Sequence, residues 1–183
     1  MTKNNFFIIT GGPGGGKTSL LESLAGQGFV IVPETARQII RERLRNGLTP
    51  RPDPHEFARQ IFETDLVNYT SHVNEMQIRF FDRSFLDSAL MLFQDDRNYF
   101  ESIVDHLITR RYNRKVFIAP PWKEIYRNDS ERDQTFEEAV SIYEKLYTWY
   151  ENNGYQLIVL PKESPEARVK FVLDQVREGE ARR

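Results

Sequence analysis

The sequence predicts an α/β fold in which a parallel β-sheet carries helices on both faces. Two observations support this prediction. Five short apolar runs alternate with longer segments whose apolar residues recur at helical spacing, as expected for buried parallel strands joined by helices. The first run also leads directly into a glycine-rich loop. The expected strands are residues 6–9, 29–32, 76–81, 115–119 and 155–160.

Three helices are expected between the strands of the first half of the chain. Residues 19–24 have leucines at helical spacing, and the glycines within 26–28 end this helix. Thr35 is the expected N-cap of the second helix, and a breaker-rich loop at 46–54 separates it from the third. The apolar residues that define the second and third helices are Ala36, Ile39, Ile40 and Leu44, then Phe57, Ile61, Leu66, Tyr69 and Val73.

The second half continues the alternation. Helical stretches are expected at 86–93 and 99–110, before the fourth strand, and at 136–150, before the fifth. Residues 125–134 form a charged, turn-like segment ahead of the third of these helices. Pro165 then lies in the first turn of a last helix, where its missing N–H is tolerated.

Composition narrows the class of protein. The chain has 183 residues, which favours a single domain over 1–183. Its 25 basic and 27 acidic residues give a net charge of −2, which provides no argument for a nucleic-acid partner or an anionic membrane. There are no cysteines, and no apolar run approaches the roughly 20 residues of a membrane span. We expect a cytoplasmic protein, in a compartment that contains nucleotides and Mg²⁺.

The glycine-rich loop fits G-x-x-x-x-G-K-[ST], with strand and helix in the required places. Backbone N–H groups can converge on phosphate oxygens only where side chains are absent, and glycine allows this. The motif predicts that Lys17 reaches the β- and γ-phosphates of ATP and that Thr18 binds Mg²⁺. The expected nucleotide-binding residues are Gly11, Gly12, Pro13, Gly14, Gly15, Gly16, Lys17, Thr18 and Ser19.

Three charged residues follow the second and third strands, at the edge where open parallel sheets bind ligands. Asp82 is the expected Mg²⁺ carboxylate, or alternatively an N-cap for a helix beginning near Ser84. Arg83 follows Asp82, at the position where motor ATPases usually have a second acid. A guanidinium there is suited to binding an acceptor that carries a negative charge or a hydroxyl group. Glu34 is the expected general base, or alternatively an acid that stabilises the next helix. Arg37 faces either this pocket or solvent.

A lid is expected at about 123–135, where Arg127 and Arg132 would approach the transferring phosphate and water would be excluded. The alternative is an ordinary surface charge run. Trp122, just before it, either stacks on a base or packs the hinge.

These residues resemble a known family over nearly the whole chain. Val32-Pro33-Glu34, Asp82-Arg83-Ser84 and the arginine-bearing lid resemble the deoxynucleoside kinases. The chain looks more closely like the small P-loop ATPases related to the nicotinamide riboside kinase domain. The residues that carry this likeness are the run from Val32 to Arg37, the triplet Asp82-Arg83-Ser84 with Asp87, and the run from Pro120 through Asp129 and Arg132. The resemblance implies that the glutamate is the base and that the Asp-Arg-Ser triplet binds metal and acceptor hydroxyl. The departure is Asp82, because deoxynucleoside kinases have glutamate there.

We therefore expect a three-layer P-loop NTPase fold of the kinase type, with strand order 2-3-1-4-5. The expected activity is MgATP-dependent phosphoryl transfer, with Lys17, Glu34, Arg83, Arg127 and Arg132 as catalytic residues. The acceptor would be a small nucleoside-, nucleotide- or riboside-like molecule. One alternative is a regulatory NTPase, although the sequence has no N-K-x-D guanine motif and no acid after Asp82. The other is a nucleotide-binding module without turnover.

Overall fold

A five-stranded parallel sheet forms the centre of the computed structural model, which describes residues 2–50, 52–126 and 135–180. Its strand order is β2-β3-β1-β4-β5, which confirms the expected order. The sheet places the end of β1 between the ends of β3 and β4. The strands are β1 (Phe6–Gly11), β2 (Val30–Val32), β3 (Arg79–Asp82), β4 (Lys115–Ala119) and β5 (Gln156–Val159).

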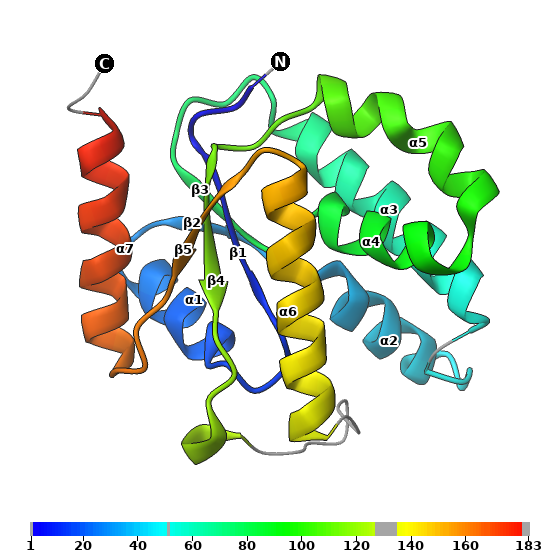
Figure 1. Cartoon of the computed structure of the whole chain (residues 1–183), viewed down its shortest axis with the longest axis horizontal. Coiled ribbons are helices and arrows are strands. Elements are labelled where there is room, and N and C mark those ends of the chain that lie inside the picture. Colours follow the sequence, from blue (N-terminus) through cyan, green and yellow to red (C-terminus); the bar gives the residue numbers. More distant parts are fainter. Residues whose placement is uncertain (1, 51, 127–134, 181–183) are drawn as a thin grey trace.

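Helices cover both faces of this sheet, giving the expected three layers (Figure 1). α1 and α7 lie on one face, and α3 to α6 lie on the other (Figure 1). A short 3₁₀ helix, η1 (Lys123–Ile125), follows β4. The α-helices are α1 (Lys17–Gly26), α2 (Thr35–Arg45), α3 (Pro54–Ser71), α4 (Phe85–Asp95), α5 (Arg97–Thr109), α6 (Phe136–Asn152) and α7 (Pro165–Glu180).

The alternation of side chains along β1 explains the two helical layers. Phe6 and Ile8 belong to the apolar cluster under α3 to α6, whereas Phe7 and Ile9 belong to the cluster under α1 and α7. All four side chains are buried. Successive residues of a strand point to opposite faces, so a continuous apolar run is what a strand covered on both sides requires.

Three local expectations need correction. The third strand begins at Arg79, not at residue 76, and Met76 is 86% exposed. Thr35 is not an N-cap but the first residue of α2, and its hydroxyl donates to Asp65 on α3. The N-cap of α4 is Ser84, with Asp87 completing a capping box, so the alternative N-cap role for Asp82 is wrong.

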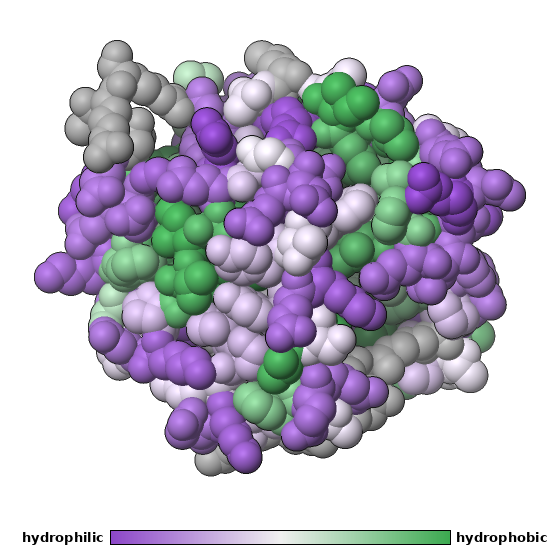
Figure 2. Space-filling model, viewed as in Figure 1, coloured by the Kyte–Doolittle hydropathy of each residue, from purple (hydrophilic) through white to green (hydrophobic). Residues whose placement is uncertain are grey.

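The surface is mostly hydrophilic in the view of Figure 2, where separate apolar patches interrupt the polar side chains. Large exposed apolar residues come from different elements; Val67 on α3 and Ile108 on α5 are two examples. Among the helices that the structure describes, none is both long enough and apolar enough to cross a membrane.

Candidate active site

The glycine-rich loop runs from the end of β1 to the start of α1, wedged between neighbouring elements. A Cβ atom on Gly11 would lie 2.4 Å from the carbonyl oxygen of Ala119 on β4. One on Gly12 would lie 2.5 Å from the carbonyl oxygen of Ala139 on α6. Gly16 is the N-cap of α1, has a φ of 72° and offers no side-chain cap. The first N–H groups of α1 are therefore left for an anion, as the motif predicts.

Lys17 lies inside this loop. Its Nζ donates to the carbonyl oxygens of Gly11 at 3.0 Å and Gly12 at 2.7 Å. Burial, reinforced by the charge of Arg83, lowers the pKa of Lys17 to about 8. The ammonium is thus mostly charged at neutral pH, and a phosphate in the loop would give it an anionic partner.

Asp82 ends β3, beside β1. Its Oδ1 atom is buried and has no hydrogen-bond partner among the described residues. Burial and the charge of Glu34 raise the pKa of Asp82 to about 6, against the opposing charges of Lys17 and Arg83. An unpaired buried carboxylate oxygen is an expected ligand for a hard cation. Asp82 and Thr18, an exposed residue at the start of α1, offer the oxygen ligands that a Mg²⁺ ion would take.

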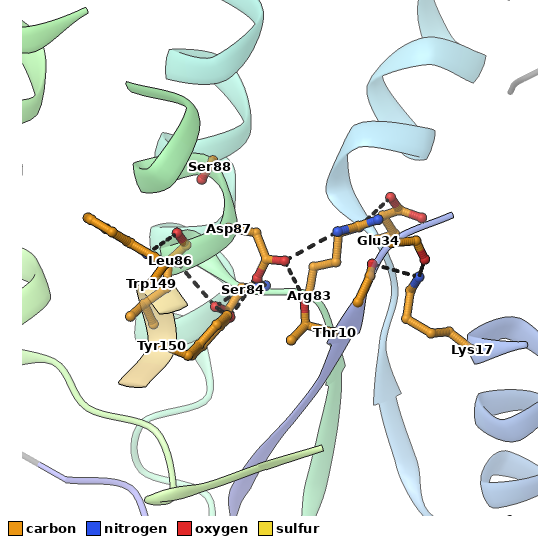
Figure 3. A network of polar contacts seen from close by, with 12 residues as sticks. Thr10, Lys17, Glu34, Arg83, Ser84, Leu86, Asp87, Ser88, Trp149 and Tyr150 are labelled. Carbon is orange, nitrogen blue, oxygen red and sulfur yellow. Dashed lines mark hydrogen bonds and ion pairs between the residues drawn. The ribbon is translucent and has the colours of Figure 1, made fainter. Parts of the chain in front are cut away.

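Arg83 has the single positive φ among the described non-glycine residues, 68°. Its backbone N–H donates to the carbonyl oxygen of Ile9 at 3.0 Å, which joins the ends of β3 and β1. The side chain then lies between two carboxylates (Figure 3). Arg83 Nε is 2.9 Å from Glu34 Oε1, and Nη1 is 3.3 Å from Asp87 Oδ1. A left-handed conformation costs a non-glycine residue about 1–2 kcal/mol, and such strain concentrates at functional sites.

Glu34 follows β2 and is held by two guanidinium groups. Arg83 contacts one carboxylate oxygen, and Arg37 Nε donates to the other at 2.9 Å. Of the two alternatives for Arg37, the structure therefore favours a side chain that faces the pocket. Burial disfavours ionisation of Glu34, but the charges of Arg83, Lys17 and Arg37 outweigh it, so the pKa of Glu34 lies below its usual value.

A buried polar network behind Arg83 fixes Asp87, and Thr10 and Tyr150 in this network carried no functional signal in the sequence. Thr10 Oγ1 donates to Asp87 Oδ1 at 2.5 Å, and Tyr150 Oη donates to Asp87 Oδ2 at 2.6 Å. The N–H of Ser84 also donates to Asp87, at 3.1 Å (Figure 3). Tyr150 lies on α6, in an aromatic run that resembles ordinary core. Asp87 was marked only by the family resemblance.

Two pockets meet at the glycine-rich loop. The first, about 540 Å³, is lined by residues 14–19, by Trp122 and Ile125, and by the start of α7. The second, about 470 Å³, lies among α2, α3, α4 and α6 and includes Glu34, Arg83 and Asp87. Pro13 lines the second pocket and the adjacent Gly14 lines the first. This arrangement suits two ligands that approach each other across the loop.

The expected lid is only partly within the described residues, and Arg127 and Arg132 lie outside them. Tyr126, the last described residue before that gap, covers the loop. A Cβ atom on Gly14 would lie 2.3 Å from the Tyr126 ring. Trp122 lines the first pocket, with the guanidinium of Arg168 5.9 Å from its ring centre. Arg168 itself was not among the residues that the sequence singled out.

Comparison with known proteins places this geometry in a family. The structure of a deoxyadenosine kinase from M. mycoides with bound dATP is similar, with a TM-score of 0.67 and 13% identity over 94% of this chain and 98% of that one. The same enzyme with the products dCMP and dCDP gives a TM-score of 0.65 and 13% identity over the same shares. The NadR protein in complex with NR gives a TM-score of 0.69 and 17% identity over 94% of this chain and 50% of that one.

At such identities the likeness shows the fold, an α/β P-loop fold shared with the deoxyadenosine kinase and the NadR protein. The sequence matches no curated protein. A family model described as an AAA domain matches residues 6–168, most of the chain. The chain therefore belongs to the AAA domain family of P-loop nucleotide-binding proteins.

Proposed function

We propose that this protein is a phosphotransferase that uses MgATP and a small nucleoside-, nucleotide- or riboside-like acceptor. The observation that carries the proposal is the Arg83–Glu34 ion pair, 2.9 Å long, in a pocket that adjoins the phosphate-binding loop. A pure nucleotide binder has no use for a second pocket with a strained arginine and a half-buried carboxylate at its junction with the first.

The donor nucleotide occupies the first pocket, and the acceptor occupies the second. Lys17 and the N–H groups of the loop hold the transferring phosphoryl group. Thr18 and Asp82 would hold a Mg²⁺ ion, which would supply positive charge to offset the negative charge of the phosphates. The acceptor hydroxyl oxygen forms a bond to the γ-phosphorus while the bond to the ADP oxygen breaks. Glu34 accepts the hydroxyl proton, and Arg83 orients the hydroxyl. Arg127 and Arg132 stay predictions as further charge-stabilising residues.

The electrostatics of Glu34 agree with this role. Two arginines keep its carboxylate ionised at neutral pH, which a proton acceptor requires. Such pairing also weakens a base. Phosphoryl transfer tolerates this, because its loose transition state depends more on orientation than on early removal of the proton.

The similar structures support the ligand classes of the proposal. One neighbour binds dATP, and another binds NR. A nucleotide and a riboside are compatible in size with pockets of about 540 and 470 Å³. The acceptor of this chain would therefore be sought among ribosides and nucleosides first.

The test is an acceptor panel. The purified protein is incubated with MgATP or MgGTP and with single nucleosides, nucleoside monophosphates or vitamin ribosides, and release of nucleoside diphosphate is measured. One acceptor class should raise the rate and gain a phosphate. If the nucleotide is hydrolysed at the same rate with every acceptor, the regulatory NTPase is the correct function. If it is never consumed, the chain is a binding module.

A further inference from the structure

Arg168 on α7 contacts the phosphate-binding loop and lines the first pocket, whereas Glu34 and Arg83 line the second. One nitrogen, Nη1, donates to the carbonyl oxygen of Gly15 at 3.1 Å and to that of Gly16 at 3.0 Å. The side chain is buried, with 2% of the residue exposed. A Cβ atom on Gly16 would lie 2.5 Å from the same Nη1, so a side chain there would displace the guanidinium, and the φ of 72° at Gly16 also favours glycine.

The two carbonyl groups fix the direction of two N–H groups. No described peptide bond is cis, so each C=O points opposite to the N–H of the following residue in the same peptide plane. Holding the Gly15 and Gly16 carbonyls toward Arg168 thus turns the N–H groups of Gly16 and Lys17 away from it. These N–H groups begin α1 and lack helical partners, which is the arrangement that binds phosphate oxygens.

The guanidinium is expensive to bury. Its Nε and Nη2 atoms have no hydrogen-bond partner among the described residues, and burial lowers the pKa of Arg168. An unpaired buried donor destabilises a fold, and an apolar side chain would pack here without that penalty. Stability of the fold therefore does not explain a buried charge at this position. A role in ligand binding does, because Arg168 lines the first pocket together with residues 14–19.

We propose that Arg168 is a positioning residue for the donor's phosphates. It orients the loop peptides so that their N–H groups face the triphosphate, and it adds a positive charge to the same pocket. This inference rests only on the nucleotide-binding part of the proposed function, because it requires neither an acceptor nor turnover. The group recognised is the polyphosphate, not the base.

The experiment measures the binding of ATP and of inorganic tripolyphosphate by calorimetry, for the wild type and for Arg168→Gln and Arg168→Lys. Loss of charge-assisted hydrogen bonds should weaken both ligands by the same factor in Arg168→Gln, about 10- to 100-fold. Arg168→Lys should restore part of the affinity, because an ammonium keeps the charge but not the guanidinium geometry. Tripolyphosphate has no base, so it separates phosphate binding from base recognition.

Arg111→Gln is the matched control. Arg111 also donates to backbone carbonyls, those of Asn153 and Leu107, and lies over the ring of Tyr155. However, it precedes β4 and so lies at the amino end of that strand, whereas the phosphate-binding loop follows the carboxyl end of β1. The Arg111→Gln variant should bind ATP and tripolyphosphate as tightly as the wild type does. The unfolding temperature of every variant is also compared without ligand. Weaker ATP binding with unchanged tripolyphosphate binding would overturn the proposal. So would unchanged affinity for both ligands in either Arg168 variant, or equal losses in Arg111→Gln.

Discussion

Arg83 and Glu34 bridge the ends of two neighbouring strands, with Nε and Oε1 2.9 Å apart. β2 and β3 pair in parallel, so the residues after each strand meet at one edge of the sheet. Arg83 reaches Glu34 from a left-handed backbone conformation, with a φ of 68°. This contact in the second pocket is therefore made at the expense of local strain.

The strain at Arg83 predicts a difference between two variants. Arg83→Ala and Arg83→Gly both remove the guanidinium, but only glycine adopts this conformation readily. The glycine variant should be more stable than the alanine variant by about 1 kcal/mol. Urea denaturation of both proteins measures this difference. Equal stabilities would show that the backbone at this position stores no strain.

The contact between the phosphate-binding loop and α6 predicts that Gly12→Ala is destabilising. The new methyl group would meet the Ala139 carbonyl at 2.5 Å, and a helix backbone cannot easily move. We expect a loss of about 1–3 kcal/mol in the free energy of unfolding. Gly26→Ala is the control, because a Cβ atom there meets nothing within 4 Å. That variant should be neutral or slightly more stable, by up to about 1 kcal/mol.

Tyr150→Phe tests whether the buried network holds Arg83 in place. The change removes the hydroxyl that donates to Asp87 at 2.6 Å and contacts Ser84 at 2.9 Å. Asp87 then loses one restraint, and Arg83 should be less well oriented toward the acceptor. We expect stability to fall by about 1–3 kcal/mol. Turnover at saturating ATP should also fall, with ATP affinity unchanged. A destabilised variant with wild-type turnover would restrict the network to a structural role, and a variant that keeps both its stability and its turnover would contradict the prediction.

Asp65 predicts a pH dependence of stability. Burial is the main cause that raises the pKa of Asp65 to about 7, with the charges of Asp87 and Glu34 acting in the same direction. The folded protein therefore holds this proton more tightly than the unfolded chain, whose carboxyl has the ordinary pKa of 3.8. The stabilisation is complete below the unfolded pKa and is lost as the pH rises through about 7.

Asp65→Asn removes this titration. The stability of the wild type relative to the variant should fall between pH 4 and pH 7, the interval set by the two pKa values, and then level off. Thermal unfolding of both proteins across that interval measures the difference. Parallel pH profiles would mean that Asp65 titrates normally in the folded state.

Local sequence signals were sufficient to predict most of the fold and to place several candidate site residues near one another. The continuous apolar runs at residues 6–9 and 115–119 lie in the sheet because both of its faces are covered. The phosphate-binding loop is defined by consecutive residues. Glu34, Asp82 and Arg83 could be placed together because strand ends in a parallel sheet share one edge.

Other residues near the pockets are positioned by contacts between residues far apart in the sequence, and such contacts leave no local sequence pattern. Arg168 lies 152 residues from Gly16, and on α7 it looks like any helical arginine. Tyr150 lies 63 residues from Asp87 in an apolar stripe. Asp65 resembles a surface acid until α2 brings Thr35 against it. Only the packing of helices on the sheet decides which of these polar groups become buried beside the pockets.

The most direct measurement follows the labelled γ-phosphoryl group of ATP in single-turnover reactions with an acceptor from the panel, for the wild type and Glu34→Gln. In the wild type the label should appear on the acceptor. In Glu34→Gln, transfer should slow by about 100-fold or more, while ATP affinity stays unchanged. The account would be contradicted if the label appeared only as inorganic phosphate, or if Glu34→Gln transferred it at the wild-type rate.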